Sequence, residues 1–217
     1  MKKSAPSIVP KYTLGEELFN SISHGVGVLL SIAALVLMIV FAAMEGNGYK
    51  LASGIVYGIS LILLYSMSMV YHIVQSKKGK AVMRIFDHCS IFVLIAGTYT
   101  PYLLTILDKA LGWTMFGIIW GMAVIGIILN SINLEKFSKI SLICYIIMGW
   151  AIVFTIKPII QRVPFMGVFL LVLGGIIYTV GVIFYILKKY KYMHSVWHLF
   201  VLGGSVCHYL SIQLFLI

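Results

Sequence analysis

Seven apolar runs, each about 20 residues long or longer, dominate this chain of 217 residues. A helix needs about 20 apolar residues to cross the hydrocarbon core of a bilayer, so each run is long enough to span a membrane. No run shows the period-two alternation expected of a membrane β-barrel. The pattern therefore predicts an all-α polytopic membrane protein with seven transmembrane helices. The predicted spans are Phe19–Met44, Leu51–Val74, Val82–Leu107, Leu111–Ser131, Phe137–Ile156, Pro164–Leu187 and His194–Ile217.

Composition supports this interpretation and excludes other classes. The chain is 61% hydrophobic and 10% charged, whereas a soluble domain carries about 25% charged residues. The net charge of +10 does not indicate nucleic-acid binding, because the charges lie in short clusters between apolar runs and form no continuous basic face. The three cysteines lie inside apolar runs without a CxxC pair, so no disulfide framework is expected.

The sequence predicts one domain. Residues 1–18 form a short polar tail that lacks the apolar core of a secretory signal, and residues 19–217 form the seven-helix transmembrane domain. The links between the runs are short and hold most of the charges.

Orientation follows from the distribution of basic residues, which are enriched on the cytoplasmic side of membrane proteins. The N-terminal tail and the second, fourth and sixth links together carry twelve lysines and arginines, and the other links carry four. We therefore expect a multi-pass protein of the cell membrane with its N-terminus in the cytoplasm and its C-terminus on the outer side.

Ionisable side chains inside the spans concentrate at one depth. Such residues are costly in a membrane and indicate function. Five of the six histidines and the one aspartate within the spans lie near the predicted cytoplasmic ends of their helices: His24, His72, Asp87, His88, His194 and His198.

Their spacing suits a metal site. His194 and His198 are four residues apart, which places both imidazoles on one helix face about 6 Å apart along the axis, and Ser68 and His72 share a face in the same way. His72, His194 and His198 together form the three-histidine set of catalytic zinc sites, in which water takes the fourth position. Zinc lowers the pKa of that water to about 7. Asp87 could orient the water or act as general base, and Ser68 could hydrogen-bond the water or an oxyanion.

Each feature also has an ordinary explanation, and the residues alone leave both open. A histidine pair can be incidental, Asp87 can satisfy free N–H groups at a helix start, and Ser68 can aid helix packing. His208 lies about 21 Å along the helix from His194 and is predicted to lie outside the site. His24 is a candidate for a contact around the site, and the pattern assigns no role to His88.

Four segments carry a resemblance to a known family: EELFNSISHGVG, SMSMVYH, FDHCSIFVLIAGTYTPY and HSVWHLFVLGGSVCH. They resemble the haemolysin III branch of the progestin and adiponectin receptor superfamily, from about Glu16 to Ile217. The resemblance implies a seven-helix fold with a cytoplasmic N-terminus, zinc bound by the three histidines, and Asp87 and Ser68 acting near the metal-bound water.

The superfamily includes alkaline ceramidases, which hydrolyse a lipid amide. By analogy the chain is expected to be a zinc-dependent hydrolase of a lipid amide or ester, with a membrane lipid as its substrate. Unlike the eukaryotic receptors, the chain has only a short N-terminal tail, which speaks against a hormone receptor.

Three other functions stand beside this one. The first is a non-catalytic sensor or structural zinc protein. The second is a cytolytic pore former, as the branch name suggests, but a chain that is apolar throughout does not suit a toxin that must first be soluble. The third is a transporter, for which internal repeats would be expected, and none is evident. Neither substrate identity nor oligomeric state can be read from the sequence.

Overall fold

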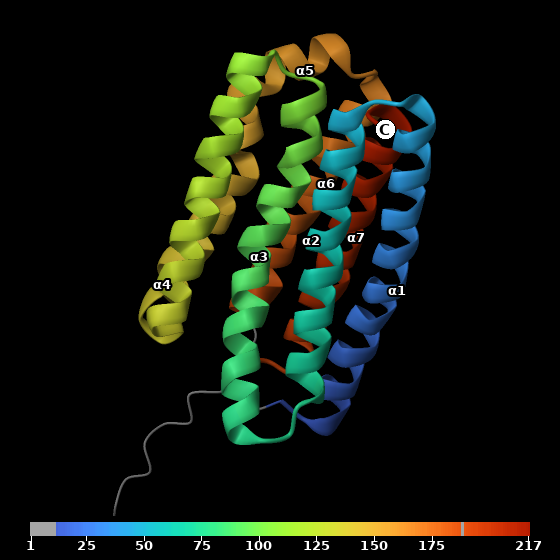
Figure 1. Ribbon diagram of the computed structural model, residues 1–217. Coiled ribbons are helices and arrows are strands. Elements are labelled where there is room, and N and C mark those ends of the chain that lie inside the picture. Colours follow the sequence, from blue (N-terminus) through green and yellow to red (C-terminus); the bar gives the residue numbers. More distant parts are fainter. Residues whose placement is uncertain (1–11, 188) are drawn as a thin grey trace, which may run out of the picture.

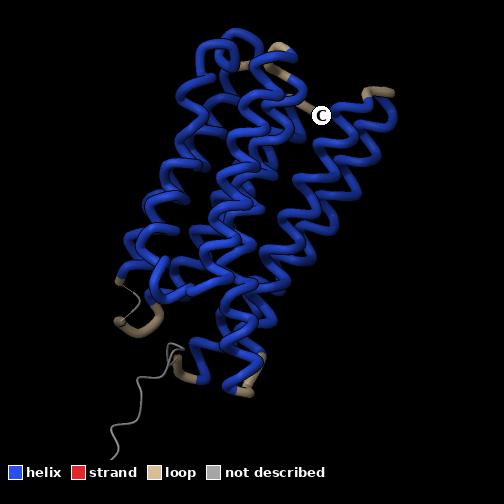
Figure 2. The backbone as a smooth tube through the Cα atoms, turned by 60° about the vertical axis from the view of Figure 1, so that its left-hand side comes forward, coloured by secondary structure: helices blue, strands red, loops and turns tan. Residues whose placement is uncertain are grey.

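The computed structural model describes residues 12–187 and 189–217, and these residues form helices joined by short turns (Figures 1 and 2). Within these described residues, six helices are long and apolar enough to cross a membrane when the fourth is counted together with the helical segments that continue it. The elements are α1 (Leu14–Glu45), α2 (Gly48–Ile73), α3 (Lys77–Thr105), α4 (Lys109–Trp150), a 3₁₀ helix η1 (Ala151–Thr155), α5 (Ile156–Arg162), α6 (Phe165–Ile186) and α7 (Met193–Phe215).

The helices pack as a closed bundle. Helix α1 contacts α2, α2 contacts α3, and α3 contacts α4, while α4 touches α6, α6 packs on α7, and α7 returns to α1. At the lower end of Figure 1 the start of α1, the end of α2 and the starts of α3 and α7 lie close together. This arrangement brings the predicted polar layer to one end of the bundle.

Helix α4 reverses direction within its length. Asn133 has a non-helical backbone (φ −160°, ψ 92°). Ser141 Oγ donates to Asn130 Oδ1 at 2.6 Å, and Asn130 Nδ2 donates to Tyr145 Oη at 3.3 Å, although residues eleven apart in a straight helix are separated by about 16 Å. Two antiparallel halves therefore meet at Asn133 (Figure 1). The fourth and fifth apolar runs correspond to these halves, and the predicted loop between them is reduced to a kink.

Several helices extend beyond the apolar runs because local side chains cap their ends. Thr13 and Glu16 form a capping box at the start of α1, and Ser76 accepts a hydrogen bond from the Gly79 N–H at the start of α3. Helix α3 thus begins at Lys77, five residues before the predicted start at Val82.

Asp87 was expected near the start of its helix, where it could satisfy free N–H groups, and this expectation was wrong. Asp87 lies ten residues inside α3. Because Ser76 caps this helix, capping by Asp87 is not the explanation for the carboxylate.

The segment between α4 and α6 also differs from prediction. The fifth run was expected to continue to Ile156 and a loop to follow, but α4 ends at Trp150 and the chain remains helical through η1 and α5. Arg162 at the end of α5 donates to the Ile106 carbonyl at 2.6 Å and to Asp108 Oδ1 at 2.8 Å. These bonds tie the segment to the end of α3.

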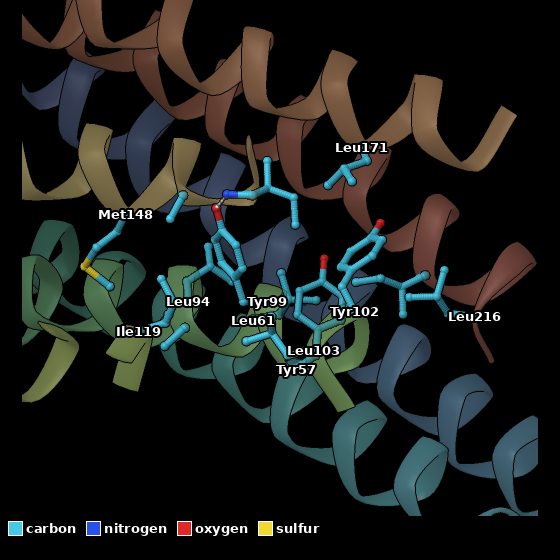
Figure 3. Packing of buried hydrophobic residues seen from close by; sticks show 14 of the residues in the cluster. Tyr57, Leu61, Leu94, Tyr99, Tyr102, Leu103, Ile119, Met148, Leu171 and Leu216 are labelled. Atoms are coloured by element: carbon cyan, nitrogen blue, oxygen red, sulfur yellow. Dashed lines mark hydrogen bonds between the residues drawn. The ribbon is translucent and has the colours of Figure 1, made fainter. Parts of the chain in front are cut away.

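The distribution of side chains suits a lipid surround. Many large apolar side chains lie exposed on the outside of the helices, whereas small polar residues such as Ser53, Ser60 and Ser211 are buried. The buried apolar residues form a cluster around Tyr99, whose hydroxyl accepts a hydrogen bond from the Ile152 N–H at 2.8 Å (Figure 3). Small and polar residues at helix contacts, with apolar residues outside, are typical of packing in membranes.

Replacing Gly112 with alanine is expected to destabilise the protein by about 1–3 kcal/mol. A Cβ atom at Gly112 would lie 2.2 Å from the carbonyl oxygen of Leu103, which is backbone and cannot rotate away. Gly117 on the same helix has nothing within 4 Å of its Cβ position, so Gly117→Ala should leave stability unchanged or raise it by up to about 1 kcal/mol. Unfolding of both variants in detergent measures the difference, and equal stabilities would contradict the close approach of α3 and α4.

Candidate metal centre

Three histidines from two helices meet at one end of the bundle. His72 is the second-last residue of α2, and His194 and His198 lie in the first two turns of α7. Their ligand atoms lie within 4.8 Å of one another, and Nε2 of His194 is 3.2 Å from Nε2 of His198. All three side chains are buried. The predicted grouping of these histidines is confirmed, and the cluster could hold a metal ion.

The orientation of His72 is fixed by Glu17, for which the sequence indicated no role in the site. Oε2 of Glu17 lies 2.7 Å from Nδ1 of His72, and Lys80 pairs with the same carboxylate. Because a carboxylate can only accept here, Nδ1 of His72 donates, and in the neutral ring this leaves the lone pair on Nε2. This buried Nε2 has no hydrogen-bond partner among the described residues. A carboxylate on the far nitrogen is the usual support of a metal-ligating histidine.

A similar hydrogen bond orients His198. Its Nδ1 donates to the main-chain carbonyl of Asn20 at 3.3 Å, which directs Nε2 toward His194. The ring of His24 stacks on the ring of His198, with centroids 3.6 Å apart and an interplanar angle of 14°. His24, which the sequence left as a candidate, therefore lies directly against the cluster.

A signal for these α1 contacts was present in the sequence. Glu17, Asn20 and His24 are spaced i, i+3 and i+7, so they form one polar stripe near the start of the helix. Glu16 caps the start of α1, and its Oε1 accepts the Tyr192 N–H at 2.8 Å, which joins the start of α1 to the link before α7.

The two residues predicted to act beside the metal lie at the same end of the bundle. Ser68 is buried one turn before His72 on α2. Asp87 is largely buried, with 14% of its side chain exposed, and its Oδ2 lies 3.6 Å from Nδ1 of His88. The roles of Ser68 and Asp87 beside a metal stay predictions.

Tyr12, just before α1, covers the cluster. Its ring stacks on His194, with centroids 5.0 Å apart, and lies 5.7 Å from the ring of His72. Burial raises the pKa of its hydroxyl, and neighbours including Tyr71 and the Asp87 carboxylate raise it further. Tyr12 is therefore a neutral phenol at physiological pH.

An apolar cavity lies beside the cluster. Its walls come from α2, α3, α4, α6 and α7. Tyr185 and Trp197 line it near the histidines, with the ring centroid of Tyr185 6.4 Å from that of His194. His208 lines it further along α7, ten residues after His198 and outside the cluster as predicted. Its apolar lining could accommodate a hydrocarbon chain.

Comparison with known proteins gives one matching family. Residues 12–209 match the family described as haemolysin-III related. A hemolysin-3 homolog from Bacillus subtilis is 44% identical over 93% of this chain and 94% of its own length. Hemolysin-3 from Bacillus cereus is 43% identical over 93% of this chain and 92% of its own. The human monocyte to macrophage differentiation factor is 28% identical over 95% of this chain and 87% of its own.

Proposed function

The chain belongs to the haemolysin III family, a multi-pass membrane family, and we propose that it is a zinc-dependent hydrolase of a lipid amide or ester. One observation carries the proposal: three buried imidazoles converge at one point, and an apolar cavity opens near one of them. The largely buried carboxylate of Asp87 lies at the same end of the bundle. Three nitrogen ligands with a place left for water are the donor set of catalytic zinc.

The residues fit a zinc ion. His72 would bind through Nε2, the atom left without a partner, while Glu17 holds its Nδ1 proton. His194 and His198 would complete the ligand set. Zinc bound there supplies a nucleophile at neutral pH, because it lowers the pKa of a water molecule to about 7, and it polarises an acyl oxygen.

The remaining groups have roles in the proposed reaction. The Asp87 carboxylate accepts the proton of the attacking water and passes it to the leaving amine or alcohol. The Ser68 hydroxyl donates a hydrogen bond to the acyl oxygen as it gains charge. The apolar cavity holds the hydrocarbon chain of the substrate, and Tyr12 shields the cluster from the side of the N-terminal tail.

We further infer seven spans, because α4 doubles back at Asn133 and can cross the membrane twice. With seven spans, the tail and the basic links all lie on one side of the membrane. The enrichment of basic residues on the cytoplasmic side then puts the N-terminus and the histidine cluster there. The substrate would then be a lipid of the cytoplasmic leaflet.

Hydrolysis of a lipid panel tests the proposal. Purified protein in nanodiscs is incubated with ceramides, other N-acyl lipids and glycerolipid esters, and released fatty acid is measured by mass spectrometry. We expect one class to be cleaved by the zinc-loaded protein, cleavage to stop after removal of zinc with a chelator, and activity to return when zinc is added back. Zinc-loaded protein that cleaves no member of the panel would count against a hydrolase.

A structural or sensory zinc site is the second candidate. The cluster joins residues far apart in the chain, since His72 ends α2 and His194 begins α7, and Glu17 adds α1. A metal ion there would hold three helices together. Loss of stability on zinc removal, together with no hydrolysis of any lipid, would favour this candidate.

A further inference from the structure

Three buried polar side chains next to the histidine cluster lack hydrogen-bond partners among the described residues. Both side-chain atoms of the Asn20 amide, both ring nitrogens of His24 and the hydroxyl of Ser195 are in this state. The exposed fractions of these residues are 0%, 3% and 3%. Buried polar groups in folded proteins nearly always have a partner, so each of these atoms requires one.

These side chains lie where α1 meets α7. Asn20 and His24 are one turn apart on the same face of α1. The main-chain carbonyl of Asn20 accepts the Nδ1 proton of His198, and the His24 ring stacks on the same residue. Ser195 lies one turn before His198 on α7. Asn20 and His24 therefore both contact one residue of the proposed metal site, and Ser195 lies one turn from it on α7.

The apolar cavity lies elsewhere. Its described lining comes from α2, α3, α4, α6 and α7 and includes no residue of α1. Asn20 and His24 therefore do not face the space proposed for the hydrocarbon chain.

The chemistry of the unpartnered atoms indicates their ligand. An amide, an imidazole and a hydroxyl offer both donors and acceptors and carry no fixed charge. Water satisfies both kinds of group at once, and a buried water molecule typically makes about three hydrogen bonds.

We propose that Asn20 and His24, with Ser195, bind ordered water between α1 and α7 and deliver it to the histidine cluster. The role in delivery rests on the proposed function. Each cleavage consumes one water: its oxygen bonds to the acyl carbon, the bond from that carbon to nitrogen or oxygen breaks, and one proton goes to the leaving group. Lipid and water would then reach the cluster from different sides.

X-ray radiolytic footprinting of the full chain in nanodiscs tests the water site, because bound water gives hydroxyl radicals that oxidise adjacent side chains. We expect His24 to be oxidised faster than Met38, a buried residue of the same helix in the apolar core whose thioether oxidises readily. Oxidation of His24 no faster than that of Met38 would overturn the proposal.

Asn20→Leu gives a second test, in which the direction of the change in melting temperature decides the outcome. Loss of bound water should lower the melting temperature by about 2–4 °C and reduce His24 oxidation to the level of Met38. If the amide has no partner at all, the same replacement removes an unsatisfied group and raises the melting temperature, which would contradict the proposal.

Asn130→Leu is the matched control. Asn130 is equally buried, but Ser141 and Tyr145 satisfy its amide. This variant should lose stability and keep the His24 footprint.

Zinc content and lipid hydrolysis, measured on the same samples, separate the two proposals. A strong His24 footprint without any hydrolysis would leave the water site standing and reject the hydrolase. The Asn20→Leu variant could instead lose the His24 footprint, keep its zinc and hydrolyse lipid at the wild-type rate. That result would reject the delivery of water and keep the hydrolase.

Discussion

Replacing Asp87 with asparagine is expected to lower the rate of lipid hydrolysis by about 10²–10⁴-fold and to leave the zinc content unchanged. Asparagine keeps the size of the side chain but cannot accept a proton. Asp87 lies ten residues inside α3 with 14% of its side chain exposed, so the carboxylate is neither a helix cap nor a solvated surface charge. Fatty-acid release and metal content of the same preparation are the two measurements.

Asp108→Asn is the control for this experiment. Asp108 follows the opposite end of α3, its side chain is 75% exposed, and it pairs with Arg162. Its replacement should leave turnover at the wild-type level. Unchanged turnover in Asp87→Asn would reject proton transfer by this residue, and loss of zinc from Asp87→Asn would show that the carboxylate supports the metal instead.

Replacing His198 with alanine is expected to remove zinc from the purified protein. Loss of an outer hydrogen-bond partner of a metal site costs about 10–100-fold in affinity, and loss of one of three ligands should cost more. His198 has Nε2 3.2 Å from that of His194, and its other nitrogen is held by the carbonyl of Asn20. Elemental mass spectrometry on protein prepared without chelators should find about one zinc per wild-type chain and background levels in the variant.

His208→Ala controls for the loss of a buried histidine from the same helix. Nδ1 of His208 donates to the Gly204 carbonyl at 2.8 Å, outside the cluster, so this variant should keep its zinc. Zinc retained by His198→Ala would reject the ligand assignment. Zinc absent from the wild type would leave a buried histidine layer whose function would lie in proton handling or transport.

The sequence predicted the core of the site because that part depends on local periodicity. His194 and His198 share a face in any α-helix, and the ends of helices two and seven could be placed from the apolar runs. Both expectations are met by α2 and α7. The start of α3 was misplaced, because the cap at Ser76 and the polar first turns of α3 lie outside the apolar pattern from which the span was read.

The contacts around the site could not be derived in the same way. Glu17 and His72 are 55 residues apart, and their hydrogen bond depends on how α1 packs against α2. Tyr12 precedes the first helix and lies over a histidine of the last one. The apolar cavity likewise exists only because α4 reverses at Asn133 and returns toward α6.

The sequence by itself determined that the chain is a membrane-embedded helical protein with a histidine layer near one end, because hydrophobic length and helical period are properties of short segments. Tertiary structure decided which polar residues meet. It brought three histidines together, gave His72 a carboxylate partner, and left His24 and Asn20 buried beside them. Such pairings are set by the packing of helices that are distant in the chain.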